Sequence, residues 1–549
     1  MRASLLSLLL YLLAFTVEAQ IQVCFQLNLA PLEQKQLLSG DEDLRVYVRG
    51  SFNNWQGTSF ELTRKPRGRI YTGTFDLEGL PGDTISFKYV IEKGEGRFFW
   101  EDDPDPSNPD HGNRRLVLKD SLLLLPEARF HTGPYFAYPV VFPKEELQAD
   151  FKQFRTILEG THPALYDYTE KAVLDSLFDS NYEAIQAKMD FRSFLMLMTE
   201  IISRVGCGHS SLWIPGDYWK VAPSALFPLK LLPSGDQLLV SDNLDGSKEV
   251  PVGSVLLSVN GEPIAEVAEH LESLSSSDGL IQAYRRGKVA QYFAVKYAMA
   301  YGFPDSFRIT YLAPGEEKPE EKVLQPVSKE QVNKGVVEHN ELSLKELQQG
   351  QVALLTINSF AYYGEVDMFK SFIDSVFQVV DRNGIDRLIL DLRGNGGGDP
   401  FCSSYLWGYL QPNPVPYFQD HYGRYDTLAN NIPQPVNHYK GKLYTLIDDR
   451  CFSTTGHFCG LLKYHRVGKF VGSETGATYT CTGNATYPAL DKTGIMVGTA
   501  RVMRYTAAVK GMDPRQGILP DHPVESTQKD LINGRDTVLE YALSLASEQ

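Results

Sequence analysis

Between residues 20 and 125, hydrophobic and polar residues alternate in short runs. The runs are LRVYVRGSF, RIYTGTFDL, TISFKYVIE and RRLVLK, and the turn-forming groups NNWQG, PRG, LPGD and EKGEG separate them. A period of two residues is typical of half-buried strands, and short strands at this spacing form β-sandwiches. We therefore predict an all-β domain over residues 20–125.

The hydrophobic period changes at Lys144. Three segments, 144–166, 170–189 and 191–206, carry hydrophobic residues at steps of three and four, which predicts helices. They end at GCGHSSLWIP. We predict a helical part over residues 140–215.

Residues 216–330 become rich in β-forming residues again, with one predicted helix. From residue 331 to 549, buried strands alternate with helices. The strands include VALLTI, DRLILDL and KLYTLI, and the first helix lies within 365–385 with one hydrophobic face. This alternation indicates α/β layering, so the chain as a whole is predicted to be multidomain α+β.

The first nineteen residues form a leucine-rich run that follows a single arginine and ends in VEA. This pattern is typical of a cleavable secretory signal peptide (1–19), with cleavage expected after Ala19. The alternative is a membrane anchor, but the run is short for a membrane span. We expect a secreted or periplasmic protein with no membrane anchor.

The 549 residues carry a net charge of −15, and the pI is about 5.3. This charge argues against nucleic acid as the main partner. Six cysteines are too few for a disulfide scaffold in so long a chain, although some could pair. Neither Cys-x-x-Cys nor His-Glu-x-x-His occurs, so we expect no metal and no cofactor.

Two loops that follow predicted core strands are the candidates for chemistry. The loop DLRGNGGGD contains glycines that can present bare backbone N–H groups, and Ser453 opens the helix after the next strand. A serine there can be an ordinary helix N-cap or a nucleophile. Donors from both loops converging on one oxygen would favour the nucleophile.

A nucleophilic serine needs a base, and two histidines are candidates. His209 lies among small residues where a predicted helix ends, and it is preferred. His457 lies one turn after Ser453 on the same predicted helix, where it would stack beside the serine rather than face it.

Four segments resemble, in order, the core of the C-terminal processing peptidases, a superfamily that includes tricorn protease and retinoid-binding repeats. They are LILDLRGNGGGD, DDRCFSTTGHF, KFVGSETGAT and QGILPDHPV. GCGHSSL resembles the histidine segment of the tricorn-like branch, with Cys207 where Asp is usual. VPVGSVLLSVNGEPIAEV resembles the PDZ-like domain of these enzymes. The resemblance implies a PDZ-like domain over 216–330 and a crotonase/ClpP-like α/β peptidase core over 331–549.

The resemblance further implies a serine-type peptidase that acts on peptides or proteins, with Ser453 as nucleophile. Backbone N–H groups of Thr454 and of Gly397 or Gly398 would form the oxyanion hole. The processing branch uses a lysine in a Gly-Lys-Gly segment, which is absent here, so His209 is the expected base.

The third catalytic residue is left open between two acidic side chains. Tricorn-like enzymes have a Glu just before the Gly-x-x-Pro-Asp segment, where this sequence offers Asp513. Glu474 is the other candidate. Either could orient the imidazole and stabilise its charged form.

The segment from about residue 40 to 120 resembles starch- and glycogen-binding modules on an immunoglobulin-like sandwich. Trp55, Lys88, Trp100 and Asn113 fall where those modules bind α-glucan. The alternative is a spacer whose tryptophans lie in the core. For the whole chain, the alternative to a peptidase is a non-catalytic ligand- or glycan-binding protein on the same fold.

Overall fold

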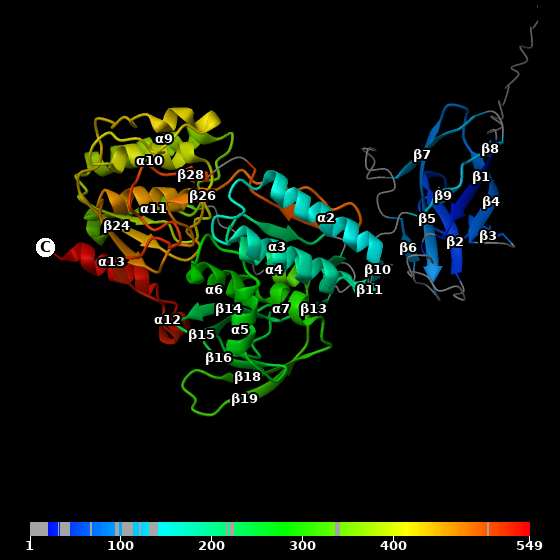
Figure 1. The fold of residues 1–549 in the computed structure, drawn as a ribbon, viewed down its shortest axis with the longest axis horizontal. Helices are drawn as coiled ribbons and strands as arrows, with labels where there is room; N and C mark the ends of the chain where they lie inside the picture. Colours follow the sequence, from blue (N-terminus) through cyan, green and yellow to red (C-terminus); the bar gives the residue numbers. More distant parts are fainter. Residues whose placement is uncertain are drawn as a thin grey trace, which may run out of the picture. The chain divides into compact units, whose positions relative to one another are not determined.

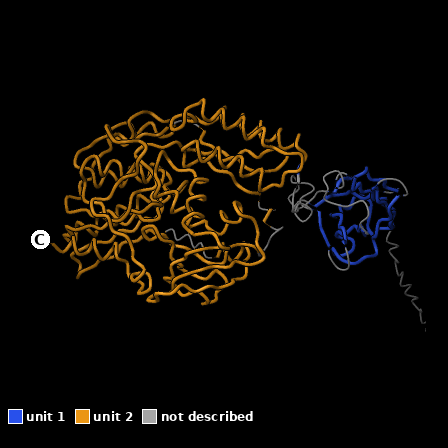
Figure 2. Tube along the Cα trace, turned by 60° about the horizontal axis from the view of Figure 1, so that its bottom comes forward, with its two compact units in different colours: residues 1–142 blue, residues 143–549 orange. Residues whose placement is uncertain are grey.

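The computed structural model describes residues 20–30, 32, 44–65, 69–93, 98–101, 113–119, 122–130, 141–215, 218–219, 224–334, 341–501 and 504–548. The predicted signal peptide therefore lies outside the described residues. The chain divides into two compact units, residues 1–142 and 143–549 (Figure 2). The finer boundaries expected within the second unit stay predictions.

Strands predominate among the described residues of the first unit, as the alternating pattern predicts. Its nine strands are β1 (Gln20–Asn28), β2 (Leu44–Gly50), β3 (Glu61–Arg64), β4 (Ile70–Glu78), β5 (Thr84–Lys93), β6 (Phe98–Trp100), β7 (Arg114–Val117), β8 (Leu123–Leu124) and β9 (Ala128–Arg129). They pair in the order β6-β5-β2-β3-β4-β1-β8, with β7 on β5 and β9 on β1. A separate hydrophobic core, which includes Phe25, Val46, Tyr71 and Ile91, packs between them.

Strand β10 (Val141–Pro143) spans the boundary at residue 143, and three helices joined by short connections follow it. These helices are α2 (Lys144–Thr161), α3 (Lys171–Glu183) and α4 (Phe191–Val205), with β11 (Lys188–Asp190) between the last two. The three predicted helical segments are thus confirmed. After α4 the chain runs directly into β12 (Ser211–Trp213), which pairs with β27 (Met496–Gly498).

A six-stranded antiparallel sheet follows. Its strands are β14 (Leu229–Ser234), β15 (Gln237–Asn243), β16 (Val255–Val259), β17 (Glu262–Pro263), β18 (Phe307–Leu312) and β19 (Glu320–Leu324). Where the sequence predicts one helix, three occur, α5 (Ile264–Ser273), α6 (Gln282–Gln291) and α7 (Phe293–Tyr301). The last two lie in a segment whose hydrophobic period is weaker. Strands β13 (Ser224–Leu226) and β20 (Val327–Ser328) pair beside α8 (Lys329–Lys334).

The remaining chain forms an α/β layer structure. The sheet has the order β21-β22-β23-β24-β25-β29, and only β21 (Leu342–Leu347) is antiparallel to its neighbour. The parallel strands are β22 (Val352–Ile357), β23 (Arg387–Asp391), β24 (Lys442–Ile447), β25 (Lys469–Gly472) and β29 (His522–Pro523). A smaller pair, β26 (Thr480–Thr482) and β28 (Arg504–Thr506), lies nearby in the chain.

Helices cover both faces of this sheet. One face packs on α9 (Val366–Arg382), α10 (Pro400–Leu410) and α11 (Thr454–Tyr464), and the other packs on α13 (Thr537–Ser547), which follows α12 (Gln528–Asn533) (Figure 1). Successive strand residues point to opposite faces, so Leu388 and Leu390 join the first core while Ile389 joins the second. Both faces are buried, which explains the continuous hydrophobic runs of these strands.

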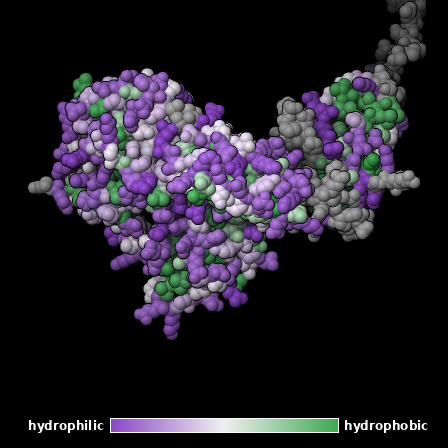
Figure 3. All heavy atoms as spheres, viewed as in Figure 1, coloured by the Kyte–Doolittle hydropathy of each residue, from purple (hydrophilic) through white to green (hydrophobic). Residues whose placement is uncertain are grey.

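Hydrophilic residues cover most of the face drawn in Figure 3. Among the described residues, no helix combines the length and hydrophobicity needed to cross a bilayer. All six cysteines carry free thiols.

Candidate active site

Ser453 lies where β24 gives way to α11. It occupies the N-cap position with φ 55° and ψ −122°, a backbone conformation that non-glycine residues rarely adopt. Its side chain makes no capping hydrogen bond to an amide of α11 within the described structure. Ser453 therefore stands at the N-cap position without the side-chain hydrogen bond of an ordinary N-cap, on a backbone held in a costly conformation.

His209 meets Ser453 from a distant part of the chain. Helix α4 ends at Gly206 in the left-handed conformation, at φ 68°, and the loop 206–210 carries the histidine over to β12. Its Nε2 lies 3.0 Å from the Ser453 Oγ. The imidazole also packs on the Phe452 ring, with 4.7 Å between ring centroids. The predicted pair is thus within hydrogen-bond reach although 244 residues separate its members.

The glycine loop after β23 lies against Ser453, but only some of its amides are available. Gly397 donates its N–H to the Asn395 Oδ1 at 2.9 Å, so that group is already bonded. For the N–H groups of Gly398 and Thr454, no acceptor occurs among the described residues. Of the two glycines considered, Gly398 is therefore the one whose N–H group is unbonded within the described structure, as is that of Thr454.

Gly397 still has a role in the approach of the two loops. A Cβ atom built on it would lie 2.8 Å from the Ser453 Cβ and 2.9 Å from the Thr454 N, and its φ is +96°. Any larger residue would push the glycine loop away from the serine. The Thr454 hydroxyl closes the contact by donating to the Gly398 carbonyl at 2.7 Å.

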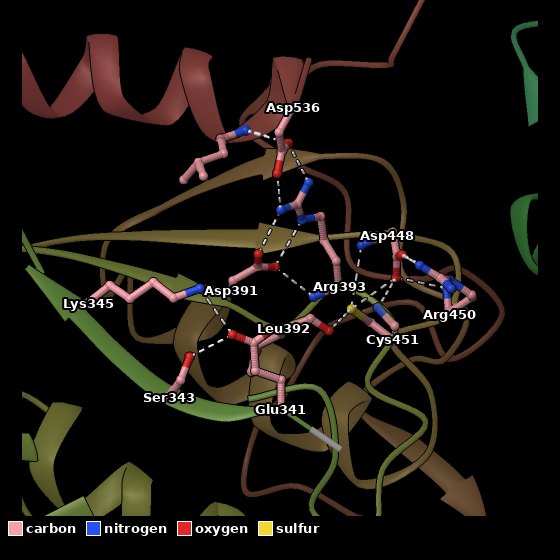
Figure 4. A network of polar contacts seen from close by, with 12 residues as sticks. Glu341, Ser343, Lys345, Asp391, Leu392, Arg393, Asp448, Arg450, Cys451 and Asp536 are labelled. Carbon is pink, nitrogen blue, oxygen red and sulfur yellow. Dashed lines mark hydrogen bonds and ion pairs between the residues drawn. The ribbon is translucent and has the colours of Figure 1, made fainter. Parts of the chain in front are cut away.

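A network of charged side chains fixes the base of the glycine loop (Figure 4). The Arg393 guanidinium donates to both carboxylate oxygens of Asp391, at 2.9 and 2.6 Å, and to both of Asp536, each at 2.7 Å. The Gly394 amide donates to the Asp448 Oδ1 at 2.9 Å. The loop is thereby tied to its own strand, to the start of α13 and to the loop before Ser453.

The two predicted third residues do not reach the histidine. Asp513 is exposed, and its carboxylate accepts hydrogen bonds from Arg515 at 3.1 and 3.2 Å. Glu474 accepts the Gly517 N–H at 2.9 Å. Nδ1 of His209 has no hydrogen-bond partner in the described part of the chain. Neither Asp513 nor Glu474 therefore makes a hydrogen bond to His209 in the described structure, because Asp513 is paired within its own loop and Glu474 accepts from the loop that contains Gly517.

Asp278 is a buried acidic residue near His209 that the sequence did not single out. It is 2% exposed, and its ligand oxygen lies within 4.8 Å of a nitrogen of His209 and of the Cys207 sulfur. Oδ1 accepts the Gly208 N–H at 2.7 Å, while Oδ2 has no partner among the described residues. Only an Asp-Gly pair after a serine run marks it in the sequence, and such a pair normally indicates a turn.

Burial is the main influence on the Asp278 carboxyl. Desolvation raises its pKa to about 6, against the lowering effect of the Gly208 hydrogen bond and of the Arg504 and Lys288 charges. A buried carboxyl group with a raised pKa is typical of functional sites, because its burial has a free-energy cost.

His457, the rival base, is fully enclosed. Its Nε2 lies 3.2 Å from the Tyr505 carbonyl oxygen and 3.4 Å from the Cys481 sulfur, and burial lowers its pKa to about 3. Its imidazole therefore serves the packing of α11 rather than Ser453.

In the first unit, the aromatic rings of two of the four predicted sugar-contacting residues lie close together. Trp55 and Trp100 are half-buried, with 6.3 Å between ring centroids and a tilt of 38°. Neither belongs to the hydrophobic core of the unit. Lys88 is half-buried on β5, opposite Arg49 of β2, and Asn113 is half-buried just before β7.

Comparison with known proteins agrees with this geometry. Residues 351–524 match the model of peptidase family S41. A tricorn protease homolog of Saccharolobus solfataricus is 26% identical over 213 residues, and the tricorn protease of Thermoplasma acidophilum is 24% identical over 214. Each match covers 39% of this chain but spans only 18% of the relative's length.

Among solved structures, mature CPAF superimposes with a TM-score of 0.55 at 14% identity, over 73% of this chain and 96% of that one. At this identity the likeness shows a shared fold. A serine and a histidine within hydrogen-bond reach beside a glycine loop form an arrangement that serine-type peptidases use. Residues 351–524 are thus similar to peptidase family S41, and tricorn proteases are among the proteins that this chain resembles.

Proposed function

We propose that the protein hydrolyses peptide bonds in peptides or proteins through an acyl-enzyme at Ser453. The observation that carries the proposal is the 3.0 Å contact between the Ser453 Oγ and the His209 Nε2. Oγ attacks the substrate carbonyl carbon while Nε2 takes the hydroxyl proton. The same nitrogen then protonates the leaving amine, and water hydrolyses the ester.

The oxyanion of the tetrahedral intermediate is assigned to the N–H groups of Gly398 and Thr454. Two observations support this assignment. Neither amide has an acceptor among the described residues. Thr454 is also the first residue of α11, and the N-terminal end of a helix favours negative charge. A single donor of this kind contributes about 3 kcal/mol to transition-state stabilisation.

Asp278 is proposed to orient His209 and to stabilise its protonated form. It takes the place of Asp513 and Glu474, which the sequence suggested. The proposal is supported because ligand atoms of Asp278 and His209 lie within 4.8 Å of each other, and because the buried Asp278 Oδ2 and His209 Nδ1 have no hydrogen-bond partner among the described residues. In unliganded sites such bonds are often long and shorten when substrate binds.

Serine-directed labelling tests the mechanism. A fluorophosphonate probe is expected to modify Ser453 in the native chain and to fail in both Ser453→Ala and His209→Ala, with circular dichroism unchanged. His421→Ala is the matched control, because this exposed histidine lies outside the site. A native chain that is folded but remains unlabelled would favour the non-catalytic binding protein instead.

Residues 216–330 are proposed to form a PDZ-like domain that holds the carboxyl terminus of a substrate. The support is the six-stranded antiparallel sheet with helices beside it, together with the sequence resemblance. If so, peptides ending in a free carboxylate should be cleaved faster than the same peptides ending in an amide.

A second candidate function, α-glucan binding, concerns the first unit, for which we propose an immunoglobulin-like sandwich. The Trp55–Trp100 pair favours it, because neither indole belongs to the core, both are only half-buried, and indole rings stack on sugars. Retention on insoluble starch should be lost in Trp55→Ala and Trp100→Ala. It should persist in Leu124→Ala, a control at an exposed site on β8.

Export is proposed from the leucine-rich segment 1–19. Amino-terminal sequencing of the exported protein should then begin at Gln20.

A further inference from the structure

Three side chains of metal-binding type converge behind the proposed nucleophile. One ligand atom each of Cys207, His209 and Asp278 lies within 4.8 Å of the others. Cys207 is 3% exposed and Asp278 is 2% exposed. The first two residues are separated by a single glycine, and the third comes from the segment between α5 and α6.

Backbone hydrogen bonds hold the two ligand-bearing segments together. Gly208 donates its N–H to the Asp278 Oδ1 at 2.7 Å, and Gly279 donates to the Gly206 carbonyl at 3.0 Å. The Ser276 hydroxyl donates to the Ser210 carbonyl at 2.9 Å. The three ligands are thus placed before any ion binds, which limits the entropy lost on binding.

Two of the three ligands have an unused polar atom. His209 Nδ1 and Asp278 Oδ2 are buried without a hydrogen-bond partner in the part of the chain described. The third, Cys207, has its sulfur 2.9 Å from the Thr482 hydroxyl oxygen. Buried polar atoms without partners carry a free-energy cost, and one cation placed between them would satisfy both at once.

We propose that Cys207, His209 and Asp278 bind one Zn²⁺ ion, and that the bound ion inhibits the peptidase. Thiolate, imidazole and carboxylate are the ligands of Zn²⁺, whereas Mg²⁺ and Ca²⁺ prefer oxygen alone. The thiolate and the carboxylate together balance the charge of the dication. Tetrahedral coordination requires ligand atoms roughly 3.3 to 3.8 Å apart, and the present limit of 4.8 Å means that the side chains need to approach by no more than about 1.5 Å. The fourth position is left to water.

The inhibition follows from the protonation state of the imidazole, and this part rests on the proposed function. Because Nε2 contacts Ser453, Nδ1 is the nitrogen left for the metal. A neutral imidazole ligated through Nδ1 carries its proton on Nε2. That nitrogen then donates to the Ser453 oxygen and cannot accept its proton, so the base is lost while the ion stays bound.

Cobalt substitution tests the site independently of activity. The full chain, stripped with a chelator, is expected to bind one equivalent of Co²⁺ with a thiolate-to-cobalt charge-transfer band. Cys207→Ser should abolish the band and weaken Zn²⁺ binding at least about tenfold, and Asp278→Asn should weaken it comparably. Cys24→Ser, in the first unit, is the matched control and should keep the band. Absence of the band, or its persistence in folded Cys207→Ser, would overturn the site.

Zinc-dependent labelling of Ser453 tests the inhibition. Each protein's rate of fluorophosphonate labelling with Zn²⁺ is compared with its own rate without the ion. The native rate should fall at least about tenfold when the site is filled, and the ratio for Cys207→Ser should stay near one. A native chain that binds Co²⁺ with the band but labels equally fast with Zn²⁺ would overturn the inhibition. A chain that never labels would contradict the proposed function and leave the metal site standing.

Discussion

At the scale of single residues, the site depends on side chains held in costly states. Ser453 has a positive φ, and Asp278 is a carboxylate with almost no exposure to water. Such features cost of order 1–3 kcal/mol each and persist only when the surrounding structure holds them. Their removal should therefore stabilise the fold while impairing the chemistry.

Asp278→Asn makes this trade measurable. The pKa of the native carboxyl is raised from the ordinary 3.8 to about 6, mainly by burial. The folded state therefore binds the proton more tightly than the unfolded state. The stability that the protonated carboxyl contributes is fully present below about pH 4 and is lost as pH rises through about 6.

The variant should accordingly be more stable than the native chain at pH 8, by up to about 3 kcal/mol, and no more stable at pH 4. The amide oxygen can still accept the Gly208 N–H. Urea titrations at the two pH values measure the difference, and the rate of Ser453 labelling should fall roughly 10²-fold. An equal effect on stability at both pH values would contradict the assigned protonation behaviour.

The two residues that local sequence patterns single out, Ser453 and His209, lie within hydrogen-bond reach of each other. Ser453 follows a hydrophobic run and opens a helix, and His209 follows a helix end, so each is identified by its neighbours in the chain. Asp278 is identified only by tertiary contact, since nothing near it in sequence points toward His209. Asp513 lies near the position expected for the third residue, but its carboxylate accepts a hydrogen bond from Arg515 instead. The sequence alone could not show which of the two partners, His209 or Arg515, Asp513 would bind.

At the scale of elements, the strand order brings the loops after β23 and β24 side by side. These are neighbouring parallel strands, so their carboxyl ends meet at one edge of the sheet. The prediction of strand, helix and strand from residue 351 is confirmed. Of the five residues that the period places on one face of α9, Phe369, Ile373, Val376 and Val380 are buried and Phe372 is half-buried. Helices α6 and α7 were missed because their hydrophobic residues follow no clear helical period.

Arg393 should matter to stability far more than a typical surface arginine. Its side chain is 22% exposed, and removing it leaves the mostly buried Asp391 carboxylate without its partner. Arg393→Ala should lower the free energy of unfolding by about 3 kcal/mol. Arg450→Ala, which removes a 54% exposed partner of Asp448, is the control and should cost about 1 kcal/mol or less. Comparable losses in urea titrations of the two variants would show that the Arg393 network is not special.

At the scale of the whole molecule, each of the two compact units has its own core. The hydrophobic cluster of the first contains residues 21 to 130 only, and the clusters around the α/β sheet begin at residue 352. The sequence predicted this division because the hydrophobic period changes near Lys144. How the segments of the second unit pack into one body could not be predicted, because side-chain contacts between distant segments decide it.

Deleting residues 20–142 should therefore leave the peptidase site intact. We expect residues 143–549 to fold and to label at Ser453 within about twofold of the full chain, because no residue assigned to the site precedes Cys207. Retention on starch should disappear. Labelling rates and circular dichroism of the shortened chain measure this, and loss of labelling in a folded fragment would show that the first unit takes part in catalysis.

The long separation between the histidine and the serine has a consequence for biosynthesis. Ribosomes make the chain from its amino end, so the polypeptide exposes His209 and the glycine loop well before Ser453 and α11 exist. On the proposed mechanism, a nascent chain cannot cleave itself or its neighbours until more than four-fifths of it has been translated. Peptide hydrolysis by the chain is thereby delayed until most of its residues have been synthesised and can fold.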